Sequence, residues 1–557
     1  MMKKLSSVRK SFPFVIALAL AIFLGAASAS AKPWSFGIIS DTQWTVADDG
    51  KNPNSVAVDI INQVNQEFIN RGVKFVIAVG DLTDNGSKLA LDTRATYVQA
   101  LYNAGIGFYP LRGNHESSGT AAAEFVRVFP QTQGGVNNQT PYDALVTTPD
   151  DVNTNPVPNM NSLFALGYNF SSPSNALNGL SYAFDFNNAR LILLDQFTPA
   201  DNSTNSIQSQ QSWINDMLAG RAAESHAFVF GHKGIITEDH ADNLFGSSPA
   251  ADPAGTDAFI TSLQDYGVHY YIGGHDHMHD RTLVSTTDGL WARVTEIVTA
   301  SDSSKFYSPA NPSNDAKYDI PAFGHTRQIP ISQDLFQIGY YIVTVDGPRA
   351  TVDYYGVPSG QVGGAIPTTP TLTGSWQKRE SFGYSLNGRE FLVAQGKSYT
   401  NVRDSFKNTT AGILGGINGS TVMDASSRPL VKAVDTGWAS KKNCVASDIF
   451  TLWGMADNMG SSKTDVYALS MSYDPKRVTP GQAKRGSFGL ATRDDNGYWS
   501  NAVDNNFGGT KKFVLGPWKS SYKLGTYGVD QQTHTAWAVI NYAGDFAAAQ
   551  FNIKDCK

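Results

Sequence analysis

Gly273-Gly274-His275-Asp276-His277-Met278-His279-Asp280 directly follows a short apolar run at 268–272. The run is β-branched and aromatic and is bounded by glycines, which predicts a buried strand. His275 and His277 leave the end of this strand two residues apart, and in extended backbone such residues point the same way. The spacing therefore predicts two imidazoles that converge on one small volume, as metal ligands do.

Polar residues also follow four other predicted strands, at 34–40, 75–79, 107–111 and 227–230. They occur in the stretches Asp41-Thr42-Gln43, Gly80-Asp81, Gly113-Asn114-His115-Glu116 and Gly231-His232. Helical patterns at 55–71, with Asn54 as predicted N-cap, and at 87–103 separate the first three strands. Such alternation predicts a sheet covered on both faces, with ligands at the carboxyl ends of its strands. We therefore expect these polar side chains to share one rim.

The candidate ligands at this rim combine oxygen and nitrogen donors. They are Asp41, Gln43, Asp81, Asn114, His232, His275 and His277. This mixture suits two divalent or trivalent ions such as Mn, Fe or Zn. Asp81 stands on a tight glycine turn, and its carboxylate is the candidate bridge between the ions. Two ions about 3.5–4 Å apart can activate a water and stabilise phosphoryl transfer.

Five ordered motifs resemble those of the calcineurin-like metallophosphoesterases, over roughly 34–355. They are Asp41-x-Gln43, Gly80-Asp81-x-x-Asp84, Gly113-Asn114-His115-Glu116, Gly231-His232 and Gly274-His275-x-His277. The resemblance implies an α/β (α+β) fold of two mixed sheets packed face to face, with flanking helices. It also implies a metal-dependent phosphoric ester hydrolase acting on a small phosphorylated substrate.

The same resemblance distributes roles among the residues. One ion would be held by Asp41, Gln43, Asp81 and His277, and the other by Asp81, Asn114, His232 and His275. His115 and Asp81 would be the catalytic residues, with His115 donating a proton to the leaving oxygen or contacting the phosphate. Asp84 and Glu116 would orient the ligands and His115.

Gln43 departs from the family pattern, which usually reads Asp-x-His. An amide oxygen binds a soft ion less well than imidazole does, which favours Mn or Fe over Zn. The Gln form resembles the branch of Mn-dependent ADP-ribose and CDP-alcohol hydrolases. Purple acid phosphatases carry a tyrosine where Asp84 stands, so that branch is disfavoured. We expect phosphodiesters or nucleotide pyrophosphates as substrates, with a phosphomonoesterase (phosphatase) as the alternative.

Composition divides the chain into a metallophosphoesterase domain at 32–358, a Gly-, Pro- and Thr-rich linker at 359–374 and an all-β, sandwich-like domain at 375–557. Residues 117–174 lose regular periodicity and are interpreted as an insertion, either a lid or a solvated loop. Tryptophans in the last domain allow wall or glycan contact, although sandwich cores also use tryptophan, which is the preferred interpretation. The alternative function of another class is therefore a surface- or glycan-binding protein with a weak or inactive metal core.

Residues 1–31 combine a basic start, an apolar run and small residues, which is typical of a secretory signal peptide. An exported protein, periplasmic or extracellular and without a membrane span after cleavage, is expected; an uncleaved anchor is the alternative. Cleavage removes four basic and no acidic residues, so the net charge changes from −6 to −10. This acidic balance argues against general nucleic-acid binding. In an exported protein Cys444 and Cys556 could pair, with free thiols as the alternative.

Overall fold

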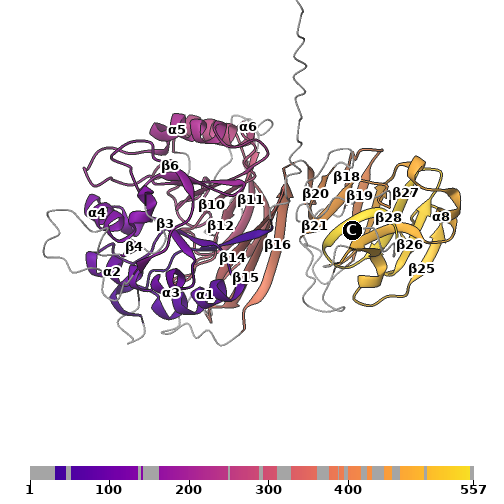
Figure 1. Cartoon of the computed structure of the whole chain (residues 1–557), viewed down its shortest axis with the longest axis horizontal. Helices are drawn as coiled ribbons and strands as arrows, with labels where there is room; N and C mark the ends of the chain where they lie inside the picture. The colour runs from indigo at the N-terminus through magenta and orange to yellow at the C-terminus, as the bar shows by residue number, and fades with distance from the viewer. Residues whose placement is uncertain are drawn as a thin grey trace, which may run out of the picture.

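The structure is a computed structural model. It describes residues 32–45, 52–135, 140–141, 162–248, 251–287, 293–309, 328–360, 375–386, 388–393, 399–415, 423–428, 444–453, 465–494 and 498–551. An N-terminal α/β lobe and a C-terminal all-β lobe lie side by side (Figure 1). The predicted signal peptide at 1–31 and most of the predicted linker lie outside the described residues.

The first sheet of the α/β lobe is mixed. In the described part of the chain its order is β16 (Gln377–Ser385), β15 (Arg349–Pro358), β14 (Gln337–Asp346), β1 (Trp34–Ile39), β2 (Phe75–Val79) and β3 (Gly107–Leu111). Strands β1, β2 and β3 are parallel, whereas β14 pairs with β1 in the antiparallel sense. The parallel strands therefore end at one edge of the sheet.

The second sheet is also mixed. Its described strands follow the order β13 (Gln328–Asp334), β11 (His279–Ser285), β12 (Arg293–Val298), β10 (Tyr270–Gly273), β9 (His226–Gly231), β8 (Ala189–Leu194), β7 (Tyr182–Phe186) and β6 (Tyr168–Ser171). Strands β8, β9, β10 and β12 are parallel. A separate short pair joins β4 (Thr140–Pro141) to β5 (Ser162–Leu163).

The two sheets pack face to face through alternate residues of their central strands. Phe36 and Ile38 from the first sheet lie in one buried cluster with Phe228, Phe230 and Ile272 from the second. Because these residues alternate along each strand, the other face of each sheet stays available for helices. The predicted face-to-face arrangement of two mixed sheets is confirmed.

Helices cover both outer faces (Figure 1). Their bounds are α1 (Val58–Arg71), α2 (Lys88–Thr96), α3 (Gln99–Asn103), α4 (Gly119–Val128), α5 (Ile207–Ala219) and α6 (Pro253–Asp265). Val64 and Phe68 of α1 pack against Val76 of the first sheet. Ile214 of α5 and Phe259 of α6 pack in a cluster with strand residues of the second sheet. The flanking helices thus match the predicted class.

Two local predictions need correction. Asn54 does not cap α1: it lies at φ 56° inside the 3-10 turn η1 (Pro53–Ser55), and the Asn52 carboxamide accepts the Asp59 amide at 3.0 Å instead. The predicted insertion at 117–174 contains the regular helix α4, whose N-cap is Ser118. Alanines on its buried face weakened the apolar periodicity. Part of the insertion lies outside the described residues, so the lid stays a prediction.

The predicted boundary at 374 does not coincide with the edge of the first sheet. β16 follows the linker, yet it pairs antiparallel with β15. Its Glu380 carboxylate accepts hydrogen bonds from His279 Nε2 at 2.8 Å and Arg281 Nη2 at 2.6 Å, both on β11. A strand that follows a long linker can return to either domain, and alternation alone does not distinguish the two outcomes.

The C-terminal lobe is a sandwich, as predicted. Its strands are β17 (Arg389–Val393), β18 (Tyr399–Val402), β19 (Thr409–Gly415), β20 (Met423–Arg428), β21 (Ile449–Trp453), β22 (Val466–Ser472), β23 (Phe488–Arg493), β24 (Trp499–Asn501), β25 (Lys512–Leu515), β26 (Thr526–Asp530), β27 (Thr535–Ile540) and β28 (Gly544–Gln550), with the short helix α8 (Pro480–Lys484). Within the described ranges they form two six-stranded sheets, β17-β20-β21-β28-β23-β24 and β18-β19-β22-β27-β26-β25. Trp453, Trp499 and Trp537 are buried, in accord with core packing and not with an exposed glycan platform.

Cys444 is disulfide-bonded, and the other cysteine of the chain, Cys556, lies outside the described residues. This finding agrees with pairing and not with free thiols. None of the helices in the described ranges has the length and apolarity that a membrane-spanning helix needs.

Candidate metal centre

The turns after β1 and β2 bring two carboxylates together. Asp41 and Asp81 have φ angles of 52° and 45°, in the left-handed region that non-glycine residues seldom adopt. The Asp41 amide donates to the Gly80 carbonyl at 3.2 Å, and the Thr42 amide donates to the Asp81 carbonyl at 2.8 Å. The two turns therefore hold each other in place. Strain of this kind concentrates at functional sites.

His275 and His277 follow β10 in the same unusual conformation, with φ angles of 73° and 50°. The expectation that extended backbone aligns them is therefore wrong, although both side chains do reach the rim. The Asp41 carboxylate accepts the His275 amide at 3.2 Å and lies 3.3 Å from His277 Nε2. The turn directs the two rings to two neighbouring positions.

Two groups of potential metal ligands share Asp81. One contains Asp81, His232 and His275, and the other contains Asp41, Asp81 and His277; within each group the ligand atoms lie within 4.8 Å of one another. This grouping agrees with the division that the family resemblance implies. The shared carboxylate is the one predicted to bridge two ions.

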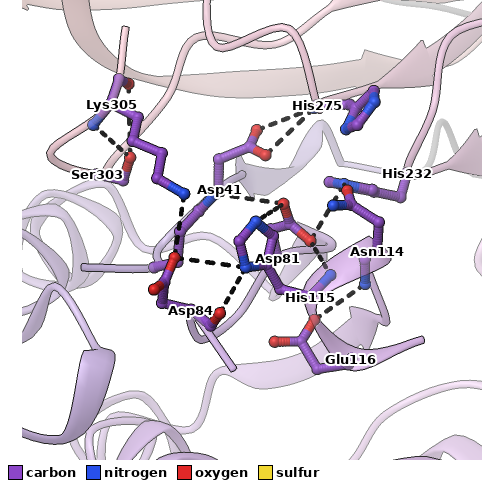
Figure 2. A network of polar contacts seen from close by, with 12 residues as sticks. Asp41, Asp81, Asp84, Asn114, His115, Glu116, His232, His275, Ser303 and Lys305 are labelled. Carbon is purple, nitrogen blue, oxygen red and sulfur yellow. Dashed lines mark hydrogen bonds and ion pairs between the residues drawn. The ribbon is translucent and has the colours of Figure 1, made fainter. Parts of the chain in front are cut away.

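The two predicted amide ligands lie at the same groups. Gln43 Nε2 is 3.2 Å from Asp81 Oδ2 and 3.1 Å from His277 Nε2, and Asn114 Oδ1 is 3.0 Å from His232 Nε2. All seven predicted ligands therefore meet at one rim, and Figure 2 shows five of them.

The donor set fits transition ions. Gln43 Oε1 is buried and has no hydrogen-bond partner. Because the two ends of an amide are interchangeable in shape, rotation of this amide turns that oxygen towards Asp81 and His277. Buried carboxylate, amide and imidazole donors in such proximity are the chemistry of a metal site.

Electrostatics favour the ionised form of the shared ligand. Burial by itself raises the pKa of Asp81, but the adjacent His232 imidazole lowers it well below the usual range. Burial conversely lowers the pKa of His232, and Asp81 raises it to about 9. The geometry thus stabilises a negative charge on Asp81 beside a positive one, and a bound cation acts in the same direction.

Backbone carbonyls orient two of the imidazoles. His232 Nδ1 donates to the Val79 carbonyl at 2.9 Å, and His277 Nδ1 donates to the Lys305 carbonyl at 2.9 Å. These bonds fix the tautomer and direct Nε2 of each ring towards the carboxylates. His275 differs, because its Nε2 lies 3.2 Å from Asp242 Oδ1 and its Nδ1 is left for the ligand group.

His115 lies at the mouth of the site with 22% of its side chain exposed. Its amide donates to Asp81 Oδ1 at 3.0 Å, and its Nδ1 donates to the Asp84 carbonyl at 2.5 Å. Nε2 is then the nitrogen that faces the ligands, 3.7 Å from Asp81 Oδ2. The imidazole touches a ligand without belonging to either ligand group.

Glu116 is fully buried beneath the site and joins two turns. Its carboxylate accepts the Thr83 amide at 2.8 Å, the Thr83 hydroxyl at 2.7 Å and the Gly113 amide at 3.0 Å. A Cβ on Gly113 would overlap the Asp81 carboxylate, so the turn after β3 approaches Asp81 as closely as glycine allows. Glu116 therefore holds the turns on either side of Asp81, which fits the orienting role that the family resemblance implies.

Several neighbours of the site were not predicted. Asp276, inside the histidine motif, accepts His240 Nδ1 at 2.7 Å, and the His240 ring lies 4.0 Å from the His275 ring. Lys305 lies beyond the end of β12, and the expectation that site residues follow strand ends would have included it. Asp242 lies outside the five motifs and does not follow a predicted strand, so the sequence did not indicate it.

Other residues next to the motifs also have clear positions. Lys233 is buried in an ion pair with Asp242, and Trp44 is a core residue. His279 and Asp280 are buried in β11 and do not extend the site.

Comparison with known proteins identifies the domain. A family model described as calcineurin-like phosphoesterase matches residues 35–279. Similar solved structures include a purple acid phosphatase from yellow lupin, with 14% identity, 64% of this chain and 54% of that chain covered, and a TM-score of 0.38. A dimetal phosphatase from Danio rerio has 15% identity, 58% and 96% coverage and a TM-score of 0.32. GAP50 of Plasmodium has 14% identity, 62% and 88% coverage and a TM-score of 0.34.

This chain spans about half the length of the lupin protein, 54%. A comparison with curated protein sequences finds no match. The family match contains all the motifs at the rim, from Asp41 to His277. Residues 35–279 therefore form a calcineurin-like phosphoesterase domain, of a family that normally binds two metal ions.

Proposed function

We propose that this protein is a dinuclear-metal phosphoesterase that hydrolyses phosphodiesters or nucleotide pyrophosphates. The observation that carries the proposal is the pair of ligand groups that share Asp81. Asp41, Gln43, Asp81 and His277 would hold one ion, and Asp81, Asn114, His232 and His275 the other. When bound, the ions would supply an activated water and stabilise charge on the phosphoryl oxygens.

The residues of the chain orient the substrate and move the proton. His115 Nδ1 is committed to the Asp84 carbonyl, so its Nε2 is the atom that gives a proton to the leaving oxygen. Asp84 keeps this ring in place, and Glu116 holds the turns that carry Asp81 and Asn114. These contacts fix the proton donor relative to the shared carboxylate.

Two features support the preference for diesters or pyrophosphates and for Mn or Fe. Gln43 replaces the usual histidine, and its amide oxygen is a harder ligand than imidazole. Asp84 occupies the position of the purple acid phosphatase tyrosine, and its carboxylate contacts Lys305 at 3.1 Å.

Hydrolysis of bis-p-nitrophenyl phosphate and p-nitrophenyl phosphate by the Mn-loaded protein tests the preference. We expect faster turnover of the diester. Faster turnover of the monoester would make the protein a phosphatase, and no turnover of either compound with metals bound would contradict the proposed activity.

Export is part of the same proposal. The basic and apolar composition of residues 1–31 supports it, and so does the disulfide bond of Cys444, because such bonds persist in oxidising compartments. N-terminal sequencing of the protein recovered from cells that express the whole chain should give a start near Lys32. An intact N-terminus would contradict cleavage.

A further inference from the structure

Lys305 is anchored beside one ligand group by its backbone. It lies in the segment 301–307 after β12, outside the residues that the family model matches. Its carbonyl accepts His277 Nδ1 at 2.9 Å, and its amide donates to Ser303 Oγ at 2.9 Å. The position of this lysine is therefore coupled to the position of a ligand histidine.

The Lys305 side chain reaches the side of the site that His115 occupies (Figure 2). Its ammonium group donates to Asp84 Oδ1 at 3.1 Å, and the same oxygen lies 3.4 Å from His115 Nδ1. Ammonium and imidazole thus meet at one carboxylate oxygen. Lys305 is therefore joined through Asp84 to His115, the residue that faces the leaving oxygen in the proposed reaction.

The ammonium of Lys305 has more N–H donors than its contacts with the described residues use. It carries three N–H bonds, and among the described residues Asp84 is its one partner. Its side chain is 21% exposed, so solvent and substrate can reach it. Lys233, which follows the ligand His232, is buried in an ion pair with Asp242.

We propose that Lys305 binds the phosphoryl group that departs when a pyrophosphate is hydrolysed, and so selects nucleotide pyrophosphates over simple diesters. This inference rests on the proposed function and narrows its substrate class. A departing phosphate carries negative charge, and charge-assisted hydrogen bonds from an ammonium stabilise it. An aryl or alkyl leaving group has only the one oxygen that His115 protonates and lacks the further anionic oxygens of a phosphate. Asp84 holds the ammonium in place for this contact.

Calorimetric binding of inorganic pyrophosphate and inorganic phosphate to the Mn-loaded full chain tests the proposal without turnover. We expect Lys305→Met to weaken pyrophosphate binding about tenfold or more and phosphate binding less than about twofold. Lys305→Arg should restore most of the pyrophosphate affinity. Lys88→Met, which removes a partly exposed lysine of α2, is the matched control and should change neither.

Removal of Lys305 also leaves the Asp84 carboxylate without its cation, and this negative charge could itself repel pyrophosphate. The double variant Lys305→Met with Asp84→Asn removes the charge and so separates this repulsion from the loss of the ammonium contact. The pyrophosphate affinity should stay low in the double variant if the ammonium itself makes the contact. Recovery of the affinity, an equal loss for both ligands, or no pyrophosphate binding by the unmodified protein would overturn the proposal. Lys305-dependent binding without hydrolysis of any ester would instead count against the proposed function alone.

Discussion

Asp81 is the side chain on which both ligand groups depend. Its carboxylate lies 3.3 Å from His232 Nε2 and 3.2 Å from Gln43 Nε2, and it accepts the His115 amide at 3.0 Å. Its left-handed backbone costs on the order of 1–3 kcal/mol, which the surrounding hydrogen bonds must offset. This residue joins the backbone geometry of β2 to the chemistry of the site.

Asp81→Asn should abolish most activity and empty the site of metal. The amide keeps the shape of the carboxylate but has one oxygen and no charge, so it cannot serve two cations equally. We expect a loss in kcat greater than the roughly 10–100-fold that outer-shell partners cause. Elemental analysis and turnover measure both effects, with Asp59→Asn on α1 as control. Full metal content with full turnover would show that another residue bridges.

Gln43→His should change the metal preference without disrupting the fold. An imidazole at this position completes the usual Asp-x-His motif and binds softer ions better than an amide does. We expect the ratio of bound Zn to bound Mn to rise after competitive loading with both metals. An unchanged ratio would remove the argument that connects Gln43 to Mn or Fe.

At the scale of secondary-structure elements, the site consists of the ends of neighbouring strands, whose turns are held together by buried hydrogen bonds. The turn after β2 and the 3-10 turn η2 (Asn114–Glu116) after β3 share the Glu116 carboxylate. Burial raises the pKa of Glu116, and the Asp81 charge raises it further. Hydrogen bonds from the backbone amides of Gly113 and Thr83 to the carboxylate lower this pKa. The turns therefore depend on one acceptor that has little exposure to water.

Glu116→Gln should loosen these turns. The amide nitrogen of glutamine would face backbone N–H groups, which leaves buried donors unpaired at a cost of about 1–3 kcal/mol each. We expect a lower free energy of unfolding and a roughly 10–100-fold decrease in kcat. Urea unfolding and steady-state kinetics measure the two effects. Glu124→Gln on α4 is the control, and equal kinetics for both variants would contradict the positioning role.

At the scale of the whole molecule, β16 connects the sheets of the α/β lobe at its border with the sandwich. Glu380 on β16 bonds His279 and Arg281 on β11, and Arg349 on β15 pairs with Asp545 of the C-terminal lobe at 3.0 Å. Burial alone raises the pKa of Glu380, but Arg281 and His279 lower it to about 2. The carboxylate thus stabilises the fold only while it is ionised.

The stability should therefore depend on Glu380 at low pH. Because its folded pKa lies below the ordinary value of 4.5, its contribution is fully present above that value and is lost as the pH falls towards about 2. The shift corresponds to about 3 kcal/mol. Urea unfolding should show a larger difference between the unmodified protein and Glu380→Gln at about pH 6 than at about pH 3. A difference independent of pH would contradict this assignment.

Local sequence predicted the strands that supply the site because each strand is a continuous apolar run. Asp41, Asp81 and Asn114 follow parallel strands of the first sheet, and His232 and His275 follow parallel strands of the second. Parallel strands within a sheet end at one edge, and the packing of the two sheets brings the two edges together. Helix α4 and strand β16 were missed for different reasons. The buried face of α4 contains alanines, which weaken its apolar periodicity. The alternation of polar and apolar residues in β16 does not indicate which sheet the strand joins.

The sequence by itself determined the order of an α/β domain and an all-β domain, together with the motifs at the strand ends. The division of the ligands into two groups that share Asp81 came from the resemblance of those motifs to a known family. Only the tertiary structure decided how Lys305, Asp242 and His240 approach the site, and that left-handed turns direct the histidines to it. The contact between Asp41 and His275 joins residues 234 positions apart, and Lys305 reaches Asp84 across 221 positions. Contacts at such separations arise from the packing of two sheets, which no local pattern of side chains encodes.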